Sequence, residues 1–154
     1  MEVEITELPA TTVAYLRYKG PFGAQIADFW AQIFNPWRAA HGLEQRVTFG
    51  VAPDDPATTP PEQCRYDACV EVAPDYEVRD PVKLATLPGG RYALAKFHGT
   101  GAQMPAAWQE FFGTWLPASG MQMDARPCFE RYAADYAIDS ATGEFAAELC
   151  IPIK

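Results

Sequence analysis

The chain has 154 residues and a mass of 17.0 kDa, which is the size of one ordinary domain and enough to bury a core. Hydrophobic residues make up 49% and charged residues 21%, a balance that is typical of a folded globular protein and excludes a disordered chain. The formal net charge is −8, and no cluster of Lys and Arg is present to neutralise phosphates, so we do not expect direct binding to nucleic acid.

The sequence shows no signal for export or for membrane insertion. Its first residues, MEVEITEL, lack a basic segment followed by an apolar run, and no apolar stretch approaches the roughly 20 residues of a membrane helix. The four cysteines form no Cys-x-x-Cys pair, and no phosphate-binding or dinucleotide motif is present. We therefore expect a cytoplasmic protein with no membrane contact, no metal and no cofactor, whose cysteines are small buried thiols.

The two halves of the sequence resemble each other at a spacing of 78 to 79 residues. Leu8-Pro9 recurs as Leu87-Pro88, Gly23-Ala24-Gln25 recurs as Gly101-Ala102-Gln103, and Trp30 and Trp37 recur as Trp108 and Trp115. Because one spacing relates all of these pairs, we interpret residues 1–154 as a single domain built from two pseudo-repeats, residues 2–73 and 82–154.

Each repeat is predicted to open with two strands. Short extended segments, residues 2–7 and 82–87, are followed by turns that contain proline or glycine. Residues 13–18 and 92–97 then have the β-branched and aromatic content of strands. We expect the two strands of each repeat to form a hairpin.

A helix follows in each repeat. In the first, an apolar stripe runs at helical spacing through Ile26, Phe29, Trp30, Ile33, Phe34 and Trp37, and in the second it runs through Trp108, Phe111, Phe112 and Trp115. Pro36 is expected to kink or shorten the first helix. Gly42 and Gly120 are expected to end the two helices in a left-handed conformation.

Two more strands complete each repeat, over residues 46–52 and 66–72 in the first and over 128–136 and 145–153 in the second. The order strand, strand, helix, strand, strand predicts an α+β fold, with the helices on one side of an antiparallel sheet.

The segment Cys128-Phe129-Glu130-Arg131-Tyr132 is the best candidate for chemistry. In a strand, Cys128, Glu130 and Tyr132 share one face. Glu130 then either pairs with a cation on a solvated face or lies in an aromatic-lined cavity, where it would need a cation or hydrogen-bond donors. Cys128 would be a nucleophile only beside a histidine, and neither histidine has a visible link to it.

These features resemble the GyrI-like small-molecule-binding domain, also called the AraC-type effector-binding domain, over essentially the whole chain. The resemblance rests on the duplicated layout together with Tyr18-Lys19-Gly20-Pro21-Phe22, Leu87-Pro88-Gly89-Gly90, Phe129-Glu130-Arg131-Tyr132 and the terminal Ile151-Pro152-Ile153. It implies two antiparallel sheets related by pseudo-two-fold symmetry, which meet at a groove between the halves. In the family this groove binds lipophilic, often cationic, aromatic compounds.

The resemblance also implies the residues of the groove. It assigns Glu130 to the floor, with Gly50 as its counterpart in the first repeat. It implies ligand-binding aromatic side chains at Tyr132, Trp108, Phe112, Tyr18 and Phe145.

Three functions are compatible with this pattern. The favoured one is a stand-alone, non-enzymatic binding module for hydrophobic, cationic aromatic small molecules, which would sequester drugs or toxins in a bacterial type of multidrug or toxin resistance, with Glu130 as counter-ion. The second is a hydrolase of cyclopropane-bearing genotoxic natural products, in which Glu130 would be the catalytic residue. The third is a protein that protects a target such as gyrase by direct contact, with the proline-rich segment 53–61 as a contact element.

Overall fold

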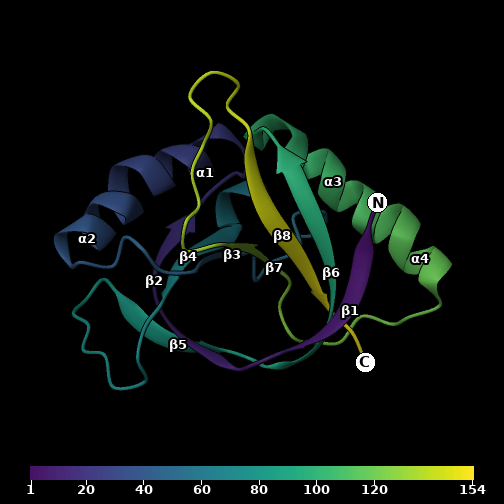
Figure 1. Cartoon of the computed structure of the whole chain (residues 1–154), viewed down its shortest axis with the longest axis horizontal. Coiled ribbons are helices and arrows are strands. Elements are labelled where there is room, and N and C mark those ends of the chain that lie inside the picture. The colour runs from purple at the N-terminus through teal and green to yellow at the C-terminus, as the bar shows by residue number, and fades with distance from the viewer.

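Eight β-strands form one antiparallel sheet in the computed structural model, which describes residues 1–154 (Figure 1). The strands are β1 (Val3–Leu8), β2 (Thr11–Lys19), β3 (Thr48–Val51), β4 (Arg65–Glu71), β5 (Lys83–Leu87), β6 (Gly90–Gly99), β7 (Phe129–Tyr132) and β8 (Phe145–Pro152). Their order across the sheet is β1-β6-β8-β7-β3-β4-β2-β5. The α+β class is confirmed, but the two expected sheets are halves of a single sheet, because β7 pairs directly with β3.

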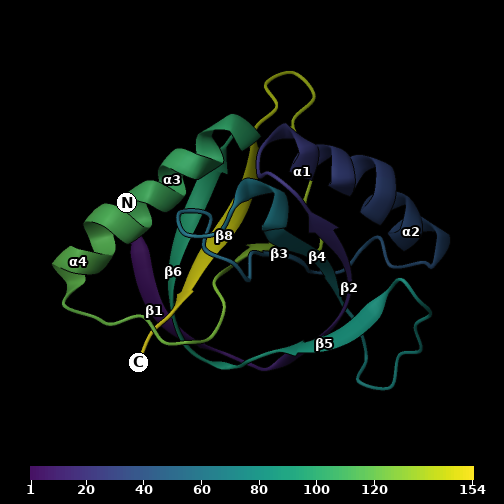
Figure 2. The same cartoon turned by 180° about the vertical axis from the view of Figure 1, so that it is seen from behind.

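Two helical rods cover one face of this sheet, one over each half (Figure 2). The first rod contains α1 (Ala24–Phe29), a π-helical turn η1 (Trp30–Phe34) and α2 (Asn35–Ala40). The second contains a 3₁₀ turn η3 (Gly101–Gln103), α3 (Met104–Glu110), a π-helical turn η4 (Phe111–Trp115) and α4 (Leu116–Ser119). A further 3₁₀ turn, η2 (Pro61–Gln63), lies in the loop before β4. None of the helices has the length and apolar composition of a membrane span.

The π-helical turn alters the stripe expected along the first rod. A π turn contains more residues than an α turn, so the side chains after it are rotated relative to an ideal α-helix. Ile33 is therefore 51% exposed, whereas Phe34 is fully buried. Pro36 does not end the rod, because it lies in the first turn of α2, where its missing N–H is not needed. The left-handed ends are confirmed at Gly42 (φ 69°) and Gly120 (φ 73°).

The expected hairpins are wrong. Strand β1 pairs with β6 of the other half, and β5 pairs with β2. The links explain the exchange: only Pro9 and Ala10 separate β1 from β2, and a two-residue hairpin needs a positive φ that proline cannot adopt. Each leading strand therefore continues across to the other half.

The sheet has an apolar core on both faces. On the helix-covered face, residues such as Phe34 and Phe111 pack the two rods onto the sheet. On the opposite face, a third cluster includes Phe49, Tyr92 and Phe129.

Cys64, Cys69 and Cys150 are buried and Cys128 is partly buried, which confirms that the cysteines are mostly buried thiols.

Candidate functional site

Glu130 lies at the centre of the sheet, where the two halves meet. It is in β7, directly opposite Gly50 of β3 in the antiparallel register. Because side chains alternate along a strand, Glu130 and Tyr132 point toward the helical rods, while Phe129 packs into the cluster on the opposite face. The carboxylate is therefore held between the two rods.

Three neutral donors occupy the Glu130 carboxylate. The hydroxyls of Tyr132 and Tyr66 donate to Oε1 at 2.9 and 3.2 Å. The indole Nε1 of Trp108 donates to Oε2 at 3.2 Å. Behind Tyr66, the Nε1 of Trp30 donates to the tyrosine hydroxyl at 3.1 Å, so the network reaches both rods.

Glu130 differs from the other partly buried carboxylates in having no cationic partner. Four of those carboxylates pair with an arginine: Asp67 with Arg17, Asp54 with Arg65, Asp124 with Arg126 and Glu148 with Arg131. The fifth, Glu144, lies 3.4 Å from a ring nitrogen of His98. No Lys, Arg or His nitrogen lies within 4.0 Å of the Glu130 oxygens. The site therefore stabilises a carboxylate by hydrogen bonds alone and leaves its negative charge uncompensated.

The electrostatics of the site follow from this burial. Desolvation raises the pKa of Glu130 above its usual value, and the hydrogen bonds from Tyr132, Trp108 and Tyr66 oppose the rise. Burial, reinforced by the nearby carboxylate, raises the pKa of Tyr66 and of Tyr132 well above the usual range. Both phenols therefore remain protonated donors at neutral pH.

Gly50 provides the space in which this network forms. A Cβ at position 50 would collide with the Tyr66 hydroxyl and would lie 2.8 Å from Oε1 of Glu130. The absence of a side chain at Gly50 thus lets Tyr66 reach across β3 to the carboxylate on β7. The room that glycine leaves is occupied by a phenol.

Aromatic rings surround the network. Trp30 packs edge-on against Tyr132 with ring centroids 5.9 Å apart, and Trp108 stacks on Phe112 at 5.5 Å. On the far side of Tyr132, Phe145 and Tyr136 lie at centroid distances of 6.2 and 5.1 Å. The carboxylate is therefore enclosed by π-systems from both halves of the chain.

The structure brings together most of the residues that the family resemblance implies for a groove. Tyr132 and Trp108 contact Glu130 directly, whereas Phe112 and Phe145 contact it only through those two rings. Tyr18 lies apart: its hydroxyl donates to the Pro21 carbonyl at 2.7 Å, and its ring packs on Phe29.

Two residues of the network, Tyr66 and Trp30, were missed by the sequence reasoning. Trp30 had a usable signal, because it is the counterpart of Trp108 in the repeat. Tyr66 had none, since its reach to Glu130 depends on the pairing of β3 with β7.

Cys128 does not take part in chemistry at this site. Burial raises the pKa of its thiol to about 12, and no histidine contacts it. A thiol in this state is protonated at neutral pH and is a poor nucleophile. Of the two candidates on this strand face, only Glu130 has a polar network around it.

Comparison with known proteins shows which family the sequence and fold resemble. The family model described as "GyrI-like small molecule binding domain" matches residues 1–154. A DNA gyrase inhibitor of Edwardsiella piscicida is 33% identical over 158 aligned positions, covering 100% of this chain and 99% of that protein. A prophage-derived protein of Bacillus subtilis (strain 168), YosT, named as a transcriptional regulator, is 31% identical over the full length of both chains.

Solved structures share the same fold at lower identity. The C-terminal domain of EcmrR superposes with a TM-score of 0.78 at 14% identity, covering 99% of this chain and 97% of that one. The structure of SAV2435 bound to tetraphenylphosphonium has a TM-score of 0.66 at 17% identity, covering 100% of this chain and 94% of that chain.

Proposed function

Because this chain belongs to the GyrI-like small-molecule-binding domain family, we propose that it binds hydrophobic, cationic aromatic small molecules, and that Glu130 is the counter-ion of the bound cation. The observation that carries the proposal is the Glu130 carboxylate, which has neutral donors on both oxygens and no cation within 4.0 Å. A related fold is known with the lipophilic cation tetraphenylphosphonium bound.

The chemistry of the site fits such a ligand. A cation that approaches Glu130 is attracted by the carboxylate, and the surrounding aromatic rings replace the water molecules that the cation loses on binding. A charge-assisted contact of this kind contributes about 1 to 3 kcal/mol, or roughly ten- to a hundredfold in affinity. The two indoles, Trp30 and Trp108, come from opposite rods, so a ligand inserted between the halves contacts both.

Ligand entry requires these rings to move. Hydrogen bonds from three donors already occupy both carboxylate oxygens, and the carboxylate borders neither of the two cavities described below. A ligand therefore enters by displacing an indole from its hydrogen bond. Trp108 is the direct candidate, because it is the donor to Oε2 and lies on the partly exposed ring of Phe112.

The test is titration with tetraphenylphosphonium, with the neutral triphenylphosphine oxide as the matched probe. Glu130→Gln keeps the shape of the side chain and removes its charge. We expect this variant to bind the cation roughly tenfold or more weakly than the parent does, and to bind the neutral probe with unchanged affinity. Glu110→Gln, on the exposed surface of α3, is the control for the change in net charge. Equal affinity of the parent and of Glu130→Gln for the cation would remove Glu130 as the counter-ion.

A second candidate is hydrolysis of an electrophilic aromatic compound. The raised pKa of Glu130 favours it, because a carboxylate with a raised pKa is a stronger base toward water. Incubation with cyclopropane-bearing genotoxic compounds, followed by mass spectrometry, would reveal ring-opened product. Turnover that Glu130→Gln abolishes supports an enzyme, whereas stoichiometric protection without product supports the binding module.

A third candidate is direct action on gyrase, which the name of the Edwardsiella relative suggests. Supercoiling by purified gyrase, measured with and without this protein and in the absence of any small molecule, tests it. A change in supercoiling at equimolar protein supports contact with the enzyme, and unchanged supercoiling excludes it.

A further inference from the structure

The face of the sheet opposite Glu130 contains an apolar cavity of about 150 Å³. Side chains alternate between the two faces along a strand. Phe49 and Phe129 therefore point into this face, because Gly50 and Glu130, the next residues on the two strands, face the rods. Most of the wall is apolar and is formed by Leu8, Pro9, Leu87, Pro88, Phe49 and Phe129. Thr11, Glu71 and Arg131 form the polar part of the wall. A cavity of this volume is large enough to hold one benzene ring.

The two crossing links enclose this cavity on one side. The link from β1 to β2 and the link from β5 to β6 touch backbone to backbone at Gly89, where a Cβ would lie 2.5 Å from the amide nitrogen of Ala10 and 2.9 Å from the carbonyl oxygen of Leu8. Pro9 and Pro88 restrict the backbone on both links. The cavity is therefore a fixed feature of the strand exchange and does not depend on mobile loops.

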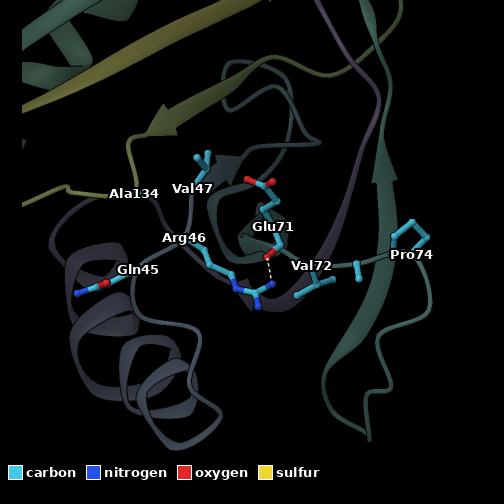
Figure 3. Close-up of a pocket in the computed structure, with 8 residues that line it drawn as sticks. Gln45, Arg46, Val47, Glu71, Val72, Pro74 and Ala134 are labelled. Carbon is cyan, nitrogen blue, oxygen red and sulfur yellow. Dashed lines mark hydrogen bonds between the residues drawn. The ribbon is translucent and has the colours of Figure 1, made fainter.

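A separate hollow of about 480 Å³ lies beside the cavity and shares Val47 and Glu71 with it. Figure 3 shows the residues that line this hollow. Arg46 lines the hollow and donates through Nη1 to the backbone carbonyl of Glu71 at 3.4 Å. Figure 3 shows the Glu71 carboxylate pointing away from that guanidinium. The hollow thus has the Glu71 carboxylate on one side and the Arg46 guanidinium, which is turned away from that carboxylate, on the other.

No cation neutralises Glu71. No Lys, Arg or His nitrogen lies within 4.0 Å of its carboxylate. Arg131, the cation that lines the cavity itself, is already paired with Glu148 at 2.7 Å. An exposed, unpaired carboxylate therefore lines the cavity, whereas Arg46, which is also in no ion pair, lines only the neighbouring hollow.

We propose that this cavity is a second ligand site, separate from Glu130, and that it takes a small monocyclic aromatic amine. The ring fills the apolar part against Phe49 and Phe129, and the ammonium group meets the Glu71 carboxylate. The volume of about 150 Å³ fits one ring, and an ammonium group adds an attraction to Glu71 that a neutral ring lacks. A carboxylate on the ring would face Glu71 with a like charge.

Benzylamine is the probe, with benzyl alcohol and benzoate as neutral and anionic probes of the same size. Binding is followed by NMR shifts of the ring protons of Phe49 and Phe129. We expect benzylamine to bind about threefold to tenfold more tightly than benzyl alcohol, and benzoate to be the weakest. The proposal is overturned if benzylamine leaves both rings unshifted, or if benzoate binds as tightly as benzylamine.

Variants distinguish the contribution of the cavity to benzylamine binding from the contributions of Glu71 and of the Glu130 site. Thr11→Phe fills the cavity from β2 and should abolish the shifts, with Val47→Phe as the alternative if the first variant does not fold. Glu71→Gln should reduce the affinity for benzylamine to that for benzyl alcohol, while Glu62→Gln, an exposed control on η2, should not. Glu130→Gln should leave benzylamine binding unchanged. Full benzylamine affinity in Glu71→Gln, or its loss in Glu130→Gln, contradicts the proposal.

Discussion

Gly50 and Glu130 face each other across the β3–β7 pair, and the hydroxyl of Tyr66 lies in the space that a side chain at Gly50 would need. The pair joins the two halves of the sheet, so the one glycine and the one acid of this junction form a single site. The hydrogen bond from Tyr66 to Glu130 depends on Gly50 having no side chain.

Substitution of Gly50 tests this dependence. Gly50→Ala should displace Tyr66 and break its bond to Glu130, which lowers the stability by about 1 to 3 kcal/mol and weakens tetraphenylphosphonium binding. Urea unfolding and ligand titration measure the two effects. Gly113→Ala is the matched control, because no atom lies within 4 Å of its added Cβ, and it should be neutral or slightly stabilising. An unchanged free energy of unfolding and unchanged affinity in Gly50→Ala would mean that the position of Tyr66 does not depend on the glycine.

Removal of the Tyr66 hydroxyl should cost more than removal of the Tyr132 hydroxyl. Tyr66→Phe deprives Glu130 of a donor and also leaves the Nε1 of Trp30 without its acceptor, whereas Tyr132→Phe removes one bond only. We expect about 1 to 3 kcal/mol for Tyr66→Phe, and a smaller loss for Tyr132→Phe, in chemical denaturation. The opposite order would show that the bond between Trp30 and Tyr66 contributes little.

The affinity for a cation should fall on mild acidification. The pKa of Glu130 is raised from the usual 4.5, so the carboxylate is protonated, and its attraction for a cation lost, at a higher pH than for an exposed glutamate. Titration of tetraphenylphosphonium from neutral pH downward should show this loss, and Glu130→Gln should show a flat profile. A parent profile that stays flat until the ordinary pKa of glutamate would contradict the burial of the charge.

The same pKa gives the sign of a stability effect. The folded state holds the Glu130 proton more tightly than the unfolded state, so this group's contribution to stability falls as the pH rises from the unfolded pKa to the folded one. Glu130→Gln should therefore raise the Tm above this window and change it little below. Thermal melts of both proteins across the acidic range measure the difference. A variant that is less stable than the parent at neutral pH would show that the hydrogen bonds outweigh the desolvation.

Neither half of the chain should fold alone. Fragments 1–80 and 81–154 each lack the strand that the other supplies, because β1 pairs with β6 and β5 pairs with β2. We expect each fragment to be unfolded by circular dichroism, and the two to regain structure when mixed. A cooperative thermal transition in either fragment on its own would contradict this prediction.

Local patterns in the sequence were sufficient to predict the elements and their order. Alternation of residue types indicated the strands, helical spacing placed Trp30 and Trp108 on comparable rods, and Gly42 and Gly120 marked where the rods end. These signals depend on residues that are close together in the sequence, so they can be recognised without knowledge of the tertiary structure.

Pairing between distant strands was beyond those patterns. The sequence suggested hairpins, although Pro9 and Pro88 argue against tight two-residue turns once the link lengths are known. Likewise, Glu130 and its aromatic neighbours could be named from the resemblance, but Tyr66 could not. Its role arises from a register that sets Gly50 opposite Glu130, and register is a property of the assembled sheet.

The central pairing also limits how much charge the junction can hold. Two identical halves related by a two-fold axis between β3 and β7 would set a glutamate directly against a glutamate. Repulsion between two neighbouring carboxylates strongly raises the pKa of one of them, so both would not stay ionised. A single chain escapes this constraint because its halves can differ in sequence. With glycine on one strand and the acid on the other, the junction carries one negative charge, which would balance the single positive charge of the proposed ligand.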